Sequence, residues 1–374
     1  MSVATTSEPA AVDLLPDRRR LGLRLALVAV VLGGLVIAIA SLPGLGEVRD
    51  RLADATPGWL VAALALQLGS CLAFVVAFRG VYCRRMPWKL SYDLAMAAQG
   101  TNALLPAGGA SGLALGGWAL TRAGMPTDHA ARRTVALYVL TSSVNFVTAA
   151  LAGGLLALGI LSGSASLGLT AGPAALAVLT MAAALRLPRV LPAGRTRESG
   201  GHLARLIASA STALAGGIED ARGLVRSRNP LAIGGSIAYM AFDLAALGAA
   251  FAAIGDVPPI GVLMLAYVLG QLGGLIPLPG GVGGADGGLI AAFVLFGTPL
   301  GAAAAAVLAY RAFQLGLPAL LGAVAVIRLP GVLRRAEDIG GLVADLPAAA
   351  PSDERAAVFP PVGSPAPAFS AQAA

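Results

Sequence analysis

The chain has 374 residues, of which 57% are hydrophobic and only 12% are charged, and its mean hydropathy is +0.80. A soluble domain carries charge on about a quarter of its residues, so this composition excludes an ordinary soluble protein. The net charge is +7, but no basic soluble domain is long enough to predict nucleic-acid binding. The long apolar runs predict an all-α polytopic membrane protein, because in lipid each backbone group must be paired within its own helix.

Six apolar runs are long enough to cross about 30 Å of hydrocarbon as full transmembrane helices. They are residues 25–42, 59–78, 134–161, 167–185, 231–254 and 300–327. The first run has about the 20 residues that a full span needs, and we interpret it as a signal anchor, although it ends in an A-x-A sequence at Ala38-Ile39-Ala40. Between the first two runs, residues 43–58 predict a short loop of mixed charge.

Three parts follow from this division of the chain. Residues 1–17 are predicted to be a disordered tail, residues 18–335 the membrane domain, and residues 336–374 a second, mostly disordered tail rich in Pro and Ala. Within the membrane domain, residues 186–228 hold eight arginines. Residues 199–226 of this segment have apolar side chains at helical spacing, which predicts an amphipathic helix on the cytoplasmic face.

The basic residues predict the topology. Of the 26 lysines and arginines, Arg49 and Arg51 follow the first run, Arg311 lies inside the last run, and the other 23 fall on one face. This count requires the apolar stretches around residues 90–121 and 257–297 to return to the side from which they enter. Because cytoplasmic loops retain Lys and Arg, we expect a multi-pass protein of the cytoplasmic (inner) membrane with both termini in the cytoplasm.

Those two stretches resemble each other. At an offset of 172 residues, Gln99 aligns with Gln271, and a Gly-Gly pair aligns with a second Gly-Gly pair. Each stretch contains a Pro/Gly break inside apolar sequence, formed by Pro106, Gly108 and Gly109 in the first and by Pro279, Gly280, Gly281 and Gly283 in the second. The shared order of Gln, Pro, Gly-Gly and Gly-x-Pro predicts an internal duplication.

The arm that follows each break is too short to cross the hydrocarbon at 1.5 Å per residue. We therefore predict two re-entrant helical hairpins, with their tips at membrane depth and their mouths on opposite faces. Such opposed hairpins are typical of inverted repeats, in which discontinuous helices build a site near the midplane. The alternative is that the Gly-Gly pairs simply let helices pack closely.

Three charged residues lie inside the predicted membrane domain: Asp243, Asp286 and Arg311. A charge at the bilayer centre costs about 2.5–3.5 kcal/mol, so such residues face the bundle interior and have partners. One interpretation is a structural salt bridge between Arg311 and an aspartate. The other is that Arg311 binds an anionic group such as a lipid phosphate, with an aspartate holding it or carrying a proton. Gln99, Asn102 and Gln271 would add uncharged hydrogen bonds.

Other kinds of site are not predicted. The glycines at 280–284 lack the G-x-G-x-x-G spacing and the Lys-Ser/Thr of a phosphate-binding loop. His129, His202, Cys71 and Cys83 have no metal-ligand spacing, and no nucleophile has a recognisable base. We therefore expect no metal, no cofactor and no enzymatic activity, and the sequence defines no oligomeric state.

The segment from Pro279 to Asp286, followed by Tyr310-Arg311, resembles a known family. This is the flippase-like membrane region at the N-terminus of lysylphosphatidylglycerol synthases, which also occurs alone. The family typically has P-G-G-x-G-x-x-E and a later Arg, with Asn and a Pro/Gly break in its first half, here at Asn102 and Pro106. Asp286 stands where the family has Glu, and the first hairpin carries no charge near its tip. The resemblance covers residues 20–330 and implies lipid handling without the synthase domain.

The expected function is translocation of a membrane lipid through a central polar site between the two hairpins. The expected partners are membrane lipids and, as a further candidate, an envelope-synthesis protein. Two alternatives stay open. One is secondary transport of a small anion, and the other is a non-transporting scaffold of an envelope-lipid synthesis complex that acts through residues 186–228.

Overall fold

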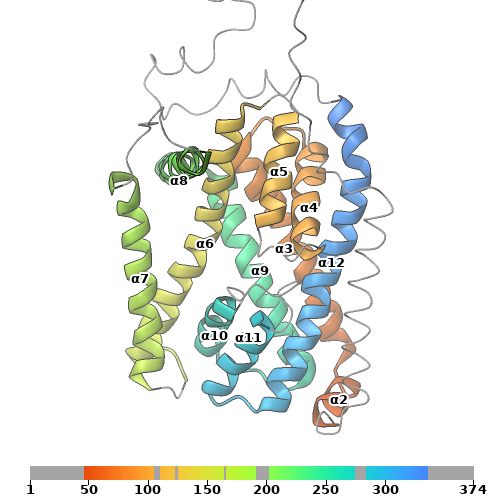
Figure 1. The fold of residues 1–374 in the computed structure, drawn as a ribbon. Coiled ribbons are helices and arrows are strands. Elements are labelled where there is room, and N and C mark those ends of the chain that lie inside the picture. The colour runs from red at the N-terminus through yellow and green to blue at the C-terminus, as the bar shows by residue number, and fades with distance from the viewer. Residues whose placement is uncertain are drawn as a thin grey trace, which may run out of the picture.

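The computed structural model describes residues 46–104, 110–122, 125–163, 166–190, 202–273 and 284–335. Within these ranges the regular elements are all α-helices, as the composition predicts (Figure 1). They are α2 (Gly46–Ala53), α3 (Pro57–Tyr82), α4 (Trp88–Leu104), α5 (Ala110–Arg122), α6 (Thr127–Ala157), α7 (Leu167–Val190), α8 (His202–Arg226), α9 (Pro230–Ile254), α10 (Ile260–Gly273), α11 (Gly284–Leu295) and α12 (Leu300–Arg335). The chain is therefore a polytopic all-α membrane protein.

Five of these helices, α3, α6, α7, α9 and α12, are long and apolar enough to cross a membrane. They coincide with five of the six predicted spans. The other predicted span, residues 25–42, lies outside the described residues, as do the two predicted tails. The outer surfaces of these helices expose large apolar side chains such as Val61, Leu151, Leu179 and Leu320. Such surfaces suit contact with lipid tails rather than with water.

Two pairs of shorter helices complete the bundle. At 1.5 Å per residue, α4, α5, α10 and α11 are each about 18–26 Å long, less than the hydrocarbon thickness of about 30 Å. The α4–α5 pair lies in the half of the molecule that carries α8, and the α10–α11 pair lies in the opposite half (Figure 1). The predicted tips, residues 105–109 and 274–283, lie outside the described residues, so re-entrance stays a prediction.

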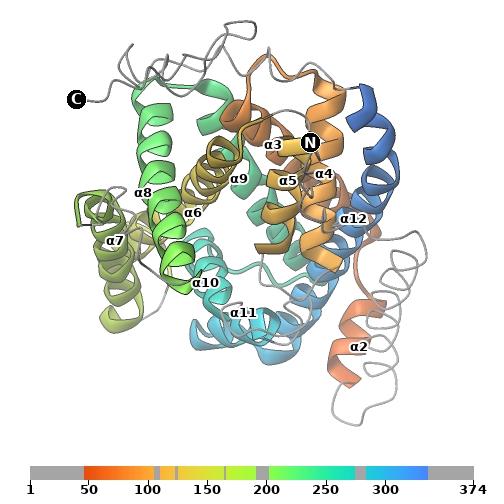
Figure 2. The ribbon, with the colours of Figure 1, turned by 45° about the horizontal axis from the view of Figure 1, so that its top comes forward.

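One helix runs across the bundle and not along it. In Figure 1 α8 is seen almost end-on beside the upright α6 and α7, and Figure 2 shows it lengthwise. It forms within the segment whose apolar spacing predicts an amphipathic helix. We call this end of the bundle the α8 end; it is the end that the basic residues predict to be cytoplasmic.

The prediction of a loop over residues 43–58 is wrong for part of that segment, because α2 forms there. Glu47 accepts a hydrogen bond from Arg51 four residues later, at 3.0 Å, which supports a short helix. Arg51 also lies 3.7 Å from Asp256, just beyond the end of α9. Val48 is buried beside Ala305 of α12, so α2 packs against the end of the bundle opposite α8.

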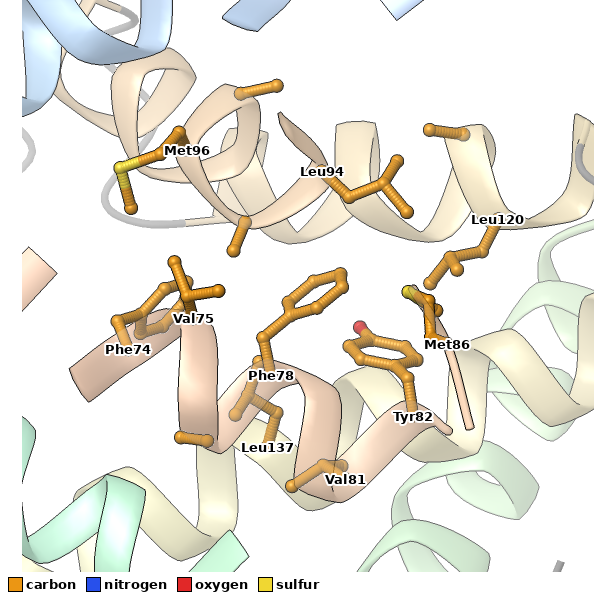
Figure 3. Packing of buried hydrophobic residues seen from close by; sticks show 14 of the residues in the cluster. Phe74, Val75, Phe78, Val81, Tyr82, Met86, Leu94, Met96, Leu120 and Leu137 are labelled. Carbon is orange, nitrogen blue, oxygen red and sulfur yellow. The ribbon is translucent and has the colours of Figure 1, made fainter. Parts of the chain in front are cut away.

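Besides the small contact between α2 and α12, the core consists of two large clusters, one in each half. The cluster at the α8 end packs α3 against α4, α5 and α6 through Phe74, Phe78, Tyr82, Leu94 and Leu120 (Figure 3). The other cluster packs α9, α10, α11 and α12. In it, Phe251 and Phe293 meet edge to face with their ring centroids 4.6 Å apart. Each cluster therefore encloses one of the two short helix pairs.

Glycines set the closest helix crossings. A Cβ added to Gly100 of α4 would lie 2.5 Å from the Cα of Gly322 in α12, and one added to Gly322 would lie 2.3 Å from the Cα of Gly100. A similar approach joins α3 and α9, where a Cβ on Gly80 would lie 2.3 Å from the backbone nitrogen of Ala232. Small residues at such crossings are typical of helix association in membranes.

Candidate functional site

A buried carboxylate joins three helices halfway along the bundle. Asp243 lies in the middle of α9, and its side chain accepts hydrogen bonds from Tyr267 of α10 at 2.5 Å and from Tyr310 of α12 at 2.7 Å. Asp243 is 4% exposed, and the two tyrosines are also buried. Both hydroxyls bond the same atom, Oδ2, so one carboxylate oxygen fixes α9, α10 and α12 relative to one another.

An ion pair lies beside this carboxylate. The guanidinium of Arg311, the residue after Tyr310, pairs with the carboxylate of Asp286 in the first turn of α11. Nη1 of Arg311 also donates to the side-chain oxygen of Gln314 one turn further along α12. The Arg311 and Asp286 side chains are 14% and 15% exposed, so the pair is largely but not completely enclosed. The position of Asp286 is favourable, because the N-terminus of a helix attracts negative charge.

Two glutamines extend the polar cluster on either side. The side chain of Gln67, in the middle of α3, hydrogen-bonds to the Asp243 carboxylate. The side chain of Gln271 hydrogen-bonds to Tyr267 one turn earlier in α10. We call the set from Gln67 to Gln314 the central polar cluster; its members are Gln67, Asp243, Tyr267, Gln271, Asp286, Tyr310, Arg311 and Gln314. The cluster draws on α3, α9, α10, α11 and α12.

The cluster holds one cation, Arg311, beside two carboxylates, Asp243 and Asp286. Arg311 lies near enough for its charge to act on Asp243 as well as on Asp286. Charge-assisted hydrogen bonds are about twice as strong as neutral ones, and they offset part of the cost of placing ions in lipid. The structure thus brings together Asp243, Asp286, Arg311 and Gln271, four of the six polar side chains predicted to form the binding site.

Gln99 and Asn102, the other two predicted site residues, lie on α4. Asn102 accepts a hydrogen bond from the backbone N–H of Gly112 at 2.7 Å, near the start of α5. Asn102 therefore ties the two arms of the first short pair together. Gln99 is 9% exposed, and within the described part of the chain its Nε2 atom has no hydrogen-bond partner.

The predicted tip residues Pro106, Gly108, Gly109, Pro279, Gly280, Gly281 and Gly283 lie outside the described residues. Among the described residues, no group of three or more His, Cys, Asp or Glu side chains is placed to hold a metal ion. Sequence reasoning missed Gln67, Tyr267, Tyr310 and Gln314. A usable signal was available for two of them, since Tyr310 precedes Arg311 and Tyr267 lies one helical turn before Gln271.

The fold and the cluster define a class: a multi-pass α-helical membrane protein with an ionic and tyrosine-lined centre inside its bundle. The sequence comparison then gives the family. Residues 23–322 match the family described as the lysylphosphatidylglycerol synthase TM region, and the chain belongs to that family. The match covers both short helix pairs and every member of the central polar cluster. No curated protein matches the chain.

Proposed function

We propose that this protein moves an amphiphilic lipid, a phospholipid or a polyprenyl-linked lipid, between the leaflets of the cytoplasmic membrane, with both termini in the cytoplasm. The observation that carries the proposal is the Arg311–Asp286 ion pair at the centre of the bundle. A lipid with an anionic head group needs a cation at membrane depth, and a guanidinium pairs with phosphate through two parallel hydrogen bonds. Membership of a lipid-synthase membrane-region family supports a lipid substrate over a soluble one.

The mechanism we propose is an exchange of partners on Arg311. At rest Asp286 holds the guanidinium; when a lipid phosphate arrives, it replaces the Asp286 carboxylate, and Asp286 re-forms the pair as the lipid leaves. Arg311 is then paired at every stage, and the displaced Asp286 carboxylate takes up a proton, which it gives up again when the pair re-forms, so neither group is left as an unpaired charge in lipid. Asp243 acts on this exchange as a positioning residue, because its bond to Tyr310 fixes the helix turn that carries Arg311.

The test is reconstitution into liposomes whose two leaflets contain fluorescent phosphatidylglycerol. A membrane-impermeant quencher added outside removes the outer-leaflet signal at once, and translocation then exposes the inner-leaflet signal. We expect faster loss of the inner signal than in protein-free vesicles, and a loss no faster across several head groups would contradict the proposal.

Two further measurements test the alternative functions, a secondary transporter of a small anion and a non-transporting scaffold. Uptake of a labelled soluble anion without lipid movement would favour a secondary transporter. Loss of function on deletion of residues 186–228, with no effect of Arg311 substitution, would favour a scaffold.

A further inference from the structure

A hollow opens between α3, α4 and α12 on a different part of the molecule from the central polar cluster. It has a volume of about 630 Å³ and lies toward the α8 end, beside the C-terminal half of α3, the start of α4 and the end of α12. Pockets for small ligands measure about 300–1,000 Å³, so the hollow is of a size to receive one molecule.

The walls of the hollow change from apolar to charged. Leu72, Val75 and Val76 of α3 are spaced at i, i+3 and i+4 and form a single apolar stripe. At the other end stand Lys89 of α4 and Arg328 of α12, whose side chains are both exposed. Because α3 runs toward the α8 end, the apolar stripe lies deeper in the bundle than the two cations.

The charged end carries more positive than negative charge. Asp93 lines the hollow but is only 8% exposed, and it lies near enough to Arg328 for their charges to interact. Asp93 therefore offsets part of the positive charge at this end, which Lys89 and Arg328 share. Two cations facing one buried carboxylate leave a net attraction for an anion.

Trp88 completes the rim as an interfacial side chain. Its ring, 52% exposed, lies 4.3 Å from the guanidinium carbon of Arg79, whose Nε donates to the backbone oxygen of Met86 at 2.7 Å. Arg79 therefore fixes the ring at the hollow and does not itself line it. Exposed tryptophans of this kind mark the head-group level of a bilayer.

We propose that this hollow binds an anionic phospholipid from the leaflet at the α8 end, with Lys89 and Arg328 on the phosphate and an acyl chain along Leu72, Val75 and Val76. The apolar stripe adjoins the positively charged end of the hollow. A molecule that contacts both must therefore carry an anionic group and an apolar chain. The site is separate from Arg311, and its occupation does not depend on translocation through the central polar cluster.

The experiment is a binding titration of the full-length protein in detergent, followed by native mass spectrometry. The probes are palmitoyl-oleoyl phosphatidylglycerol, the matching diacylglycerol without phosphate, and glycerol 3-phosphate without acyl chains. We expect saturable binding of phosphatidylglycerol alone. Equal binding of glycerol 3-phosphate would overturn the lipid assignment in favour of a soluble anion, and equal binding of the diacylglycerol would overturn the role of the phosphate.

Substitutions inside and outside the hollow test whether the lipid binds there. Lys89→Gln with Arg328→Gln should weaken phosphatidylglycerol binding about tenfold through two lost charge-assisted contacts. The matched control, Arg84→Gln with Arg226→Gln, removes two exposed charges outside the hollow and should leave binding unchanged. Leu72→Trp should weaken binding by filling the apolar end. Lys89→Gln alone alters one exposed side chain and gives a second readout if the double variant does not fold.

Two further results would overturn the proposal. One is unchanged binding in Lys89→Gln with Arg328→Gln. The other is loss of binding in Arg311→Ala, which would place the lipid at the central polar cluster instead. Retained binding in Arg311→Ala is expected, and it keeps this proposal distinguishable from lipid translocation.

Discussion

Arg311 and Asp286 join the last long helix to the first turn of α11 inside the membrane region. Neither residue belongs to an aqueous surface, since each side chain is about one-seventh exposed. The pair lies beside the Asp243 carboxylate of α9, which accepts hydrogen bonds from Tyr267 of α10 and Tyr310 of α12. This arrangement gives a set of expectations that separate a structural role from a transport role.

The first prediction concerns the charge balance of the pair. Arg311→Gln or Asp286→Asn alone should lower stability by about 2–3 kcal/mol, because each leaves the opposite charge unpaired in a largely enclosed place. The double variant, Arg311→Gln with Asp286→Asn, should recover most of that loss. Thermal unfolding in detergent, followed by size-exclusion chromatography, measures the loss of stability in each variant. If the losses of the two single variants simply add in the double variant, the pairing is contradicted.

The second prediction concerns the tyrosine hydroxyls on Asp243. Tyr310→Phe and Tyr267→Phe should each cost about 1–2 kcal/mol, because each removes one hydrogen bond from a buried carboxylate. Asp243→Ala should cost more, since it leaves two hydroxyls and the Gln67 amide without their shared partner. The matched control is Tyr138→Phe, whose residue is 59% exposed on α6. Equal unfolding temperatures for the control and the two buried variants would refute the assignment.

The third prediction concerns the Gly100–Gly322 crossing of α4 and α12. Gly100→Ala should destabilise the protein by about 1–3 kcal/mol, because its Cβ meets backbone that cannot move aside without separating the helices. Gly316→Ala on α12 meets open space and should be neutral or slightly stabilising, as alanine favours the helix. The same thermal assay compares them, and similar values for the two variants would show that the crossing tolerates a methyl group.

The fourth prediction concerns the attachment of α8. Asp220 of α8 pairs with Arg132 at 2.8 Å and lies 3.7 Å from the buried Arg133, both on α6. Asp220→Asn should loosen α8 and raise its hydrogen–deuterium exchange, because Arg133 loses its counter-charge in a site where it is 5% exposed. Glu219→Gln, on the exposed face of the same helix, should leave exchange unchanged. An equal rise in both variants would exclude Asp220 as the anchor.

The fifth prediction concerns topology. Cys71 and Cys83 are buried, so single added cysteines can be labelled against a low background. Ser227→Cys should react with an impermeant maleimide only from the cytoplasm, and Ser162→Cys only from outside. If the short pairs are re-entrant, Gly108→Cys should not react from outside and Gly281→Cys should not react from the cytoplasm. Labelling of Gly108→Cys from outside and of Gly281→Cys from the cytoplasm would mean that each pair crosses the membrane twice.

Hydropathy and charge alone predict a large part of this structure. The five described spans follow from apolar runs, and Asp243, Asp286 and Arg311 stand out because charge is costly in lipid. That Arg311 pairs with Asp286, while Asp243 is held by two tyrosines, depends on how each helix rotates about its axis. Residue spacing does not define that rotation between helices distant in sequence.

The polar residues that sequence reasoning missed have a common cause. Gln67, Tyr267 and Tyr310 cost less in lipid than a charge does, so they attract little attention inside apolar runs. Asp220 was missed for a different reason. In the sequence, the arginines of residues 122–133 indicate topology only, and the partner of Arg132 lies 88 residues away on another helix. Such a pairing follows from tertiary packing.

The most direct measurement of the central claim is lipid translocation by the charge-neutral double variant. If Arg311 and Asp286 only hold helices together, Arg311→Gln with Asp286→Asn should restore both stability and translocation relative to the single variants. If Arg311 receives the head group, the double variant should be folded yet move fluorescent phosphatidylglycerol no faster than protein-free liposomes. We predict the second result, and wild-type rates in the folded double variant would contradict it.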